Sequence, residues 1–210
     1  MAGCCNPDPA PFDGMSPDYR RRLWAVIAIN ATMFAVEMGA GYMAGSQALK
    51  ADALDFLGDA LTYGISLAVI GSPLSVRSNA ALFKGASLLV MGLWVFGSTV
   101  HQVFVAGVPS APIMGAIGFL ALAANLASVL LLVAYKDGDA NVRSVWLCSR
   151  NDAIGNVAVM VAALGVWGTA TGWPDLIVAG LMAALFLSSA FQIVRQALAE
   201  KRGAMALASE

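Results

Sequence analysis

Long apolar stretches, separated by short breaks rich in glycine, proline and serine, run along almost the whole chain. A helix needs about 20 residues to cross a bilayer core of about 30 Å. Six stretches reach that length, at 23–43, 47–70, 78–104, 111–135, 145–168 and 173–195. The breaks between them contain residues that end helices, such as Gly45 and Pro174. The pattern therefore predicts an all-α integral membrane protein, a bundle of six transmembrane helices.

Composition agrees with a single membrane domain that has short tails. Of the 210 residues, 59% are hydrophobic and 12% are charged, whereas a soluble domain has roughly a quarter of its residues charged. We expect a polar N-terminal tail (1–22), a membrane domain (23–195) and a C-terminal tail (196–210). The net charge of −1 argues against a nucleic-acid partner, which requires a basic face.

The positively charged residues predict the orientation in the membrane. The connections at 44–46, 105–110 and 169–174 contain no lysine or arginine. Because basic residues stay on the cytoplasmic side, we expect both termini to be cytoplasmic, in an inner (plasma) membrane of the bacterial type. The basic residues outside the spans or at their ends are Arg20, Arg21, Arg22, Arg77, Lys136, Arg143, Arg195, Lys201 and Arg202.

An internal match relates the two halves of the chain. Segment 55–59 in the second span matches segment 152–156 in the fifth span at an offset of 97 residues. Three helices per half would give the halves opposite topology, as in many transporters with a site at the membrane midplane. The match predicts an inverted 3+3 repeat, and a chance match of small apolar residues is the alternative.

Ionisable residues inside the spans are costly, so each needs a partner or a function. Acidic residues outnumber basic ones there, and a buried surplus of carboxylates is typical of a cation-binding site. The acids are Glu37, Asp52, Asp55, Asp59 and Asp152, and the bases are Lys50, Lys84 and Arg150.

Spacing places four oxygen-bearing side chains at one depth. Asp55 and Asp59 are four residues apart and share one helix face, and Asp152 and Asn156 repeat this spacing. At a rise of about 1.5 Å per residue, Asp59 should lie level with Asp152, and Asp55 level with Asn156. Two antiparallel helices would then surround one ion with four oxygen ligands.

A structural explanation of the same charges stays open. Lys84 and Arg150 also lie within the predicted spans and could neutralise the aspartates as ion pairs. Glu37 and Asp52 lack a matching partner in the opposite helix, so both a structural role and a supporting role at the site remain open for them.

The same residues resemble a known family. An Asp-Ala pair at 52–53 precedes an aspartate, three residues and a second aspartate, as in the second helix of cation diffusion facilitator transporters. Segment 152–156 resembles their fifth helix. The resemblance covers the whole membrane part and implies a dimeric transporter, not an enzyme, that exports zinc, cobalt, cadmium, iron or manganese, often in exchange for protons. It implies no resident cofactor. It assigns the transport site to Asp55, Asp59, Asp152 and Asn156, with Asp52 in support.

The chain departs from the family pattern in three ways. No histidine occupies either motif, and the only histidine of the chain is His101. Asn156 stands where the family usually has an aspartate. About 15 residues follow the sixth span, so we expect the family's usual cytoplasmic domain to be missing and any dimer to rest on membrane contacts.

The N-terminal tail carries a vicinal thiol pair, Cys4 and Cys5. Thiols stay reduced in the cytoplasm, and a thiol pair can capture a soft metal ion and pass it to the membrane site. A tail without such a role is the alternative.

Two other functions compete with metal export by alternating access. An intramembrane aspartyl protease would use Asp59 and Asp152 from different helices, but Phe56 occupies the place of the first glycine of its signature. A metal-gated sensor or channel would share the site and differ only in its flux behaviour.

Overall fold

The computed structural model describes residues 16–69, 74–105, 107–137 and 140–207. Within these ranges the chain forms six α-helices and one short 3₁₀ helix, which confirms the predicted all-α six-helix bundle. The α-helices are α1 (Pro17–Ala44), α2 (Gln47–Ala68), α3 (Leu74–Val105), α4 (Ala111–Leu132), α5 (Ala140–Thr169) and α6 (Trp173–Leu207), and the 3₁₀ helix is η1 (Val133–Tyr135).

Five of these helices are long and apolar enough to cross a membrane, namely α1, α3, α4, α5 and α6. Helix α2 has 22 residues, which at a rise of about 1.5 Å per residue also spans a bilayer core of about 30 Å. Its three aspartates, Asp52, Asp55 and Asp59, lie within the span and set it apart from the other five helices. The chain is therefore a multi-pass membrane protein.

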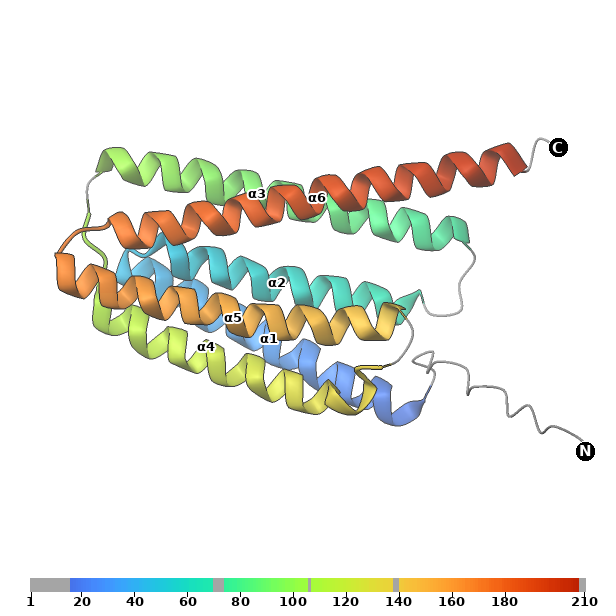
Figure 1. Ribbon diagram of the computed structural model, residues 1–210, viewed down its shortest axis with the longest axis horizontal. Coiled ribbons are helices and arrows are strands. Elements are labelled where there is room, and N and C mark those ends of the chain that lie inside the picture. The colour runs from blue at the N-terminus through green and yellow to red at the C-terminus, as the bar shows by residue number, and fades with distance from the viewer. Residues whose placement is uncertain (1–15, 70–73, 106, 138–139, 208–210) are drawn as a thin grey trace, which may run out of the picture.

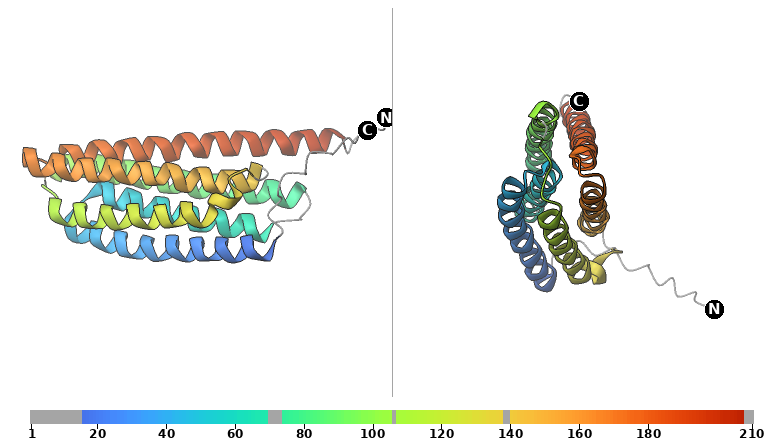
Figure 2. Two further views of the ribbon diagram at one scale, coloured as in Figure 1. Left: turned by 60° about the horizontal axis from the view of Figure 1, so that its bottom comes forward. Right: turned by 90° about the vertical axis from the view of Figure 1, so that its left-hand side faces the viewer.

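Each helix of the first half lies beside its counterpart in the second half. Helices α3 and α6 form one edge of the bundle, α2 and α5 the middle, and α1 and α4 the other edge (Figure 1). The α3–α6 pair is antiparallel, since Gly85 lies against Val194 and Gly92 against Leu187. All helices follow one long axis, and the start of α1 and the end of α6 lie at the same end of the bundle (Figure 2). This is the arrangement expected of the predicted inverted repeat.

The helix ends follow local sequence signals. Ser46 caps α2, because its hydroxyl oxygen accepts the Leu49 N–H at 3.0 Å. Gly45 adopts φ 67°, which allows the tight turn between α1 and α2. Helix α6 extends to Leu207, whereas the sixth span was predicted to end at 195, because the segment that follows consists mostly of residues with high helix propensity.

Candidate metal site

One face of α2 carries the acidic residues, and α5 lies against that face. Asp52, Asp55, Asp59 and Tyr63 are spaced three or four residues apart, so they point to one side of the helix. Two contacts tie this side to α5: Asn156 donates to Asp52 at 2.6 Å, and the Tyr63 hydroxyl oxygen lies 3.5 Å from the Val145 carbonyl oxygen. The two helices therefore run antiparallel, as the sequence predicted.

Three carboxyl groups meet between these helices, and we call them the three-aspartate cluster: Asp55, Asp59 and Asp152. Each is half-buried. The Asp152 carboxyl lies close enough to those of Asp55 and Asp59 to interact with them electrostatically, and its Oδ2 atom is buried without a hydrogen-bond partner. The Tyr63 hydroxyl donates to Asp59 Oδ2. Carboxylates this close repel one another in a low dielectric unless a cation or protons lie between them.

Asn156, the fourth residue of the expected site, lies one turn away from this cluster. Its amide donates to Asp52, and its carbonyl oxygen accepts from Asn125 at 2.8 Å. The prediction that Asn156 lies level with Asp55 is therefore wrong by one turn. The depth count started from the predicted ends of the spans, and α5 begins at Ala140 and not at 145.

The basic residues of the spans have other partners in the described part of the chain. The Lys84 ammonium donates to the Ser66 hydroxyl at 2.7 Å. The Arg150 guanidinium lies over the Trp146 ring and donates to Asn151. Among described residues, the recorded ion pair joins Arg22 to Asp18 near the start of α1. The alternative in which Lys84 and Arg150 neutralise the aspartates is therefore not the arrangement of this structure.

No group of three or more His, Cys, Asp or Glu side chains in the described ranges is already arranged to hold a metal ion. The three-aspartate cluster thus has the donor atoms of a cation site but would have to close around an ion. His101 is exposed on α3. Cys4 and Cys5 lie outside the described residues.

Two polar residues near these elements were not singled out from the sequence. Tyr63 stands four residues after Asp59, a spacing that does signal a contact on one helix face. Asp175, at the start of α6, is 1% exposed and accepts hydrogen bonds from the Ser46 hydroxyl and the Gln47 and Ala48 N–H groups. Because these partners lie 127 to 129 residues away in sequence, no local pattern could have revealed them.

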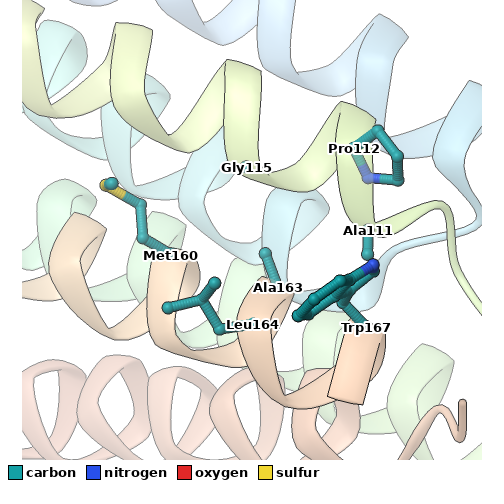
Figure 3. Close-up of a pocket in the computed structure, with 7 residues that line it drawn as sticks. All are labelled: Ala111, Pro112, Gly115, Met160, Ala163, Leu164 and Trp167. Carbon is teal, nitrogen blue, oxygen red and sulfur yellow. The ribbon is translucent and has the colours of Figure 1, made fainter. Parts of the chain in front are cut away.

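An apolar pocket of about 230 Å³ lies between α4 and α5, and no acidic residue lines it (Figure 3). Trp167 and Leu164, two of its lining residues, are 77% and 67% exposed. An apolar, outward-facing lining suits lipid contact and offers no ligand for a cation. The lining residues are Ala111, Pro112, Gly115, Met160, Ala163, Leu164 and Trp167.

Comparisons with known proteins identify relatives of this chain. The family model described as "Cation efflux transmembrane domain" matches residues 75–200. "Zinc transporter ZitB" of Escherichia coli is 30% identical over 197 residues, which cover 86% of this chain and 62% of that protein. "Metal cation efflux system protein CzcD" of Cupriavidus metallidurans is 25% identical, over 85% of this chain and 60% of that protein. "Cadmium, cobalt and zinc/H(+)-K(+) antiporter" of Bacillus subtilis is 22% identical, over 78% and 57%. The chain thus spans about 60% of the length of the curated relatives it matches.

Proposed function

This chain belongs to the cation efflux family, also called the cation diffusion facilitator family, and on that premise we propose that it exports a divalent transition-metal cation from the cytoplasm. The observation that carries the proposal is the three-aspartate cluster, where Asp55 and Asp59 of α2 lie close enough to Asp152 of α5 to interact with it. Relatives named as zinc and metal-cation transporters support it.

The cluster would bind the ion by closing its carboxylates around it. Tyr63 orients Asp59 through its hydroxyl, as second-shell groups commonly orient metal ligands. When the ion leaves, protons neutralise the carboxylates, so export is coupled to proton entry by alternating access between the two sides of the membrane. One relative is named as an antiporter of metal ions with H(+) and K(+), which supports an exchange mechanism.

The ligand set favours harder ions than a site with histidine would. Carboxylate oxygens suit manganese and similar ions, whereas imidazole suits zinc and its neighbours. We therefore propose that manganese, iron(II) or cobalt is handled relatively better here than by relatives with histidine ligands. Zinc accepts carboxylates in tetrahedral geometry and stays within the substrate range.

We place the protein in a bacterial inner membrane as a homodimer with both termini in the cytoplasm. The start of α1 and the end of α6 lie at the same end of the bundle (Figure 1), and the basic connections lie on the side of the termini in the predicted topology. The protease alternative has no support from the matched family, whose description is that of cation efflux.

Transport into proteoliposomes tests the proposal. Purified protein should move Mn²⁺, Co²⁺ or Zn²⁺ across the membrane, and a pH gradient should accelerate it. Asp59→Asn, which keeps the size of the side chain and removes its charge, should reduce transport to the level of empty liposomes. Asp18→Asn is the matched control, because Asp18 is an acidic residue exposed at the start of α1. Full transport by folded Asp59→Asn protein would refute the assignment of the site.

A further inference from the structure

A second polar group lies beside the three-aspartate cluster, completely enclosed by the bundle. It consists of Glu37 from α1, Asp52 from α2, Asn125 from α4 and Asn156 from α5, and we call it the four-helix polar group. Their side chains are 0%, 1%, 3% and 0% exposed, respectively. The three aspartates of the cluster, by contrast, are only half-buried. Burial this complete requires a reason, because unpaired polar groups in the interior are costly.

A chain of amides holds one of the two acids in place. Asn125 donates to the Asn156 carbonyl oxygen at 2.8 Å, and Asn156 donates to Asp52 Oδ2 at 2.6 Å. Each amide thereby has a defined orientation: the Asn125 N–H₂ group points to Asn156, and the Asn156 N–H₂ group points to Asp52. Asp52 is therefore fixed from the side of α4 and α5, and Glu37 of α1 also lies beside it.

Glu37 faces Asp52 without any hydrogen-bond donor of its own. Its carboxyl lies close enough to the Asp52 carboxyl to interact with it, and both of its oxygens are buried without a hydrogen-bond partner. Buried carboxylate oxygens that lack a partner and lie beside a second carboxyl form an arrangement in which a bound cation can supply the missing contacts.

No basic side chain of the described residues supplies the compensating charge. Lys50 is the nearest base in sequence, and its ammonium lies over the Tyr42 ring, 4.5 Å from the ring centre. The ion pair recorded for the described part is Arg22–Asp18, in the first turns of α1. Two buried carboxylates side by side are stable only with a positive charge between them or when protonated.

We propose that Glu37 and Asp52 form a second cation-binding site, which receives the divalent ion after it leaves the three-aspartate cluster. The inference rests on the proposed transport function. Asp52, Asp55 and Asp59 follow one face of α2, and Asp52 lies about 10 Å from Asp59 along the helix. This face of α2 thus offers two binding sites to the ion in turn. The second site, at Glu37 and Asp52, lies nearer to the turn between α1 and α2. Its ligands are all oxygens, which suit Mn²⁺ and other hard divalent ions.

Binding stoichiometry tests the proposal without any transport measurement. Equilibrium dialysis of the purified protein in detergent against Mn²⁺ should give about two ions per chain for the wild type. Glu37→Gln should reduce this to about one ion, because the replacement keeps the shape and removes a charged ligand. Asp59→Asn should also leave about one, and the double variant should bind none. Asp18→Asn is the control and should bind as the wild type does.

Each outcome decides between the sites. A wild type that binds one ion per chain overturns the second site, whatever the variants do. Glu37→Gln protein that binds as many ions as the wild type overturns the second site too. If in that case Asp59→Asn still loses one bound ion, the proposed transport function stands without the second site. If Glu37→Gln protein aggregates in size-exclusion chromatography, Asp52→Asn and the wild-type stoichiometry decide instead. Loss of one ion in Glu37→Gln but none in Asp59→Asn would support the second site and overturn the first.

Discussion

Replacing Asp175 with alanine tests how α2 is held at its first turn. Asp175 accepts three hydrogen bonds across the helix boundary: from the Ser46 hydroxyl at 2.5 Å, the Gln47 N–H at 2.8 Å and the Ala48 N–H at 3.0 Å. The backbone N–H groups at the start of a helix have no partner within it. The α6 carboxylate therefore serves as a cap for α2, and its negative charge also suits the positive end of the α2 dipole.

The magnitude lies between two reference values. Hydrogen bonds to charged groups in water-soluble proteins contribute about 1.5–3 kcal/mol each, whereas those between membrane helices average about 0.6 kcal/mol. Three bonds at the lower value give roughly 2 kcal/mol, and the Gln47 and Ala48 N–H groups would remain buried without a partner. We expect Asp175→Ala to lower the free energy of unfolding by about 3 kcal/mol.

The assay is unfolding by SDS in mixed micelles, followed by circular dichroism. Asp175→Asn should lie between wild type and Asp175→Ala, because an amide oxygen still accepts a hydrogen bond but carries no charge. Ser188→Ala is the control: the Ser188 hydroxyl is exposed and bonds only to the Leu185 carbonyl of its own helix, so the change should stay within about 0.5 kcal/mol. If Asp175→Ala also stays within that range, the cross-helix cap does not stabilise the bundle and the reasoning fails.

Three further variants examine the site and the packing. Tyr63→Phe should raise the Kd for Mn²⁺ about tenfold in equilibrium dialysis, because the ligand carboxylate loses its orienting hydroxyl; an unchanged Kd would exclude that role. Asp152→His should raise the zinc-to-manganese ratio of transport at one pH, since imidazole suits zinc better; a constant ratio in active protein would mean that Asp152 does not ligate the ion. Gly85→Ala should destabilise the α3–α6 pair by about 1–3 kcal/mol, because a Cβ there would lie 2.7 Å from Val194 Cγ2. The matched Gly97→Ala meets nothing within 4 Å and should be neutral or stabilising by up to about 1 kcal/mol in SDS unfolding; equal effects of the two changes would contradict the packing argument.

The helices could be predicted from the sequence because membrane burial leaves an unambiguous pattern. Long apolar runs and the break at Gly45-Ser46 correspond to the observed α1 and α2. Even α2, with its three aspartates, was predicted as a span because the stretch 47–70 is long enough to cross the bilayer, and the observed helix has 22 residues. Helix α6 continues to Leu207, beyond the predicted span end at 195, because hydropathy marks where the apolar run stops and not where the helix stops.

The meeting of the acidic faces of α2 and α5 could be predicted in outline but not in register. Spacing of three and four residues places the acids of each helix on one face, and Asp59 and Asp152 interact between the two helices. One helical turn is about 5.4 Å. Depth in the membrane was estimated by counting residues from the predicted ends of the spans, which cannot resolve less than one turn. Asn156 therefore faces Asp52, where Asp55 had been expected. The role of Asp175 depends on contacts between residues far apart in sequence, which no local pattern records.

The anchoring of α2 at one end makes that helix a lever. The tight turn at Gly45, the Ser46 cap and the Asp175 carboxylate all act on its first turn, which is therefore its natural pivot. Displacement grows with distance from a pivot, so a tilt of about 10° moves Asp59 by about 3 Å and Asp52 by only about 1 Å, given a rise of about 1.5 Å per residue. A small tilt of α2 would thus move Asp59 toward or away from Asp152 and so close or open the three-aspartate cluster. Asp52, which lies near the pivot, would hardly move.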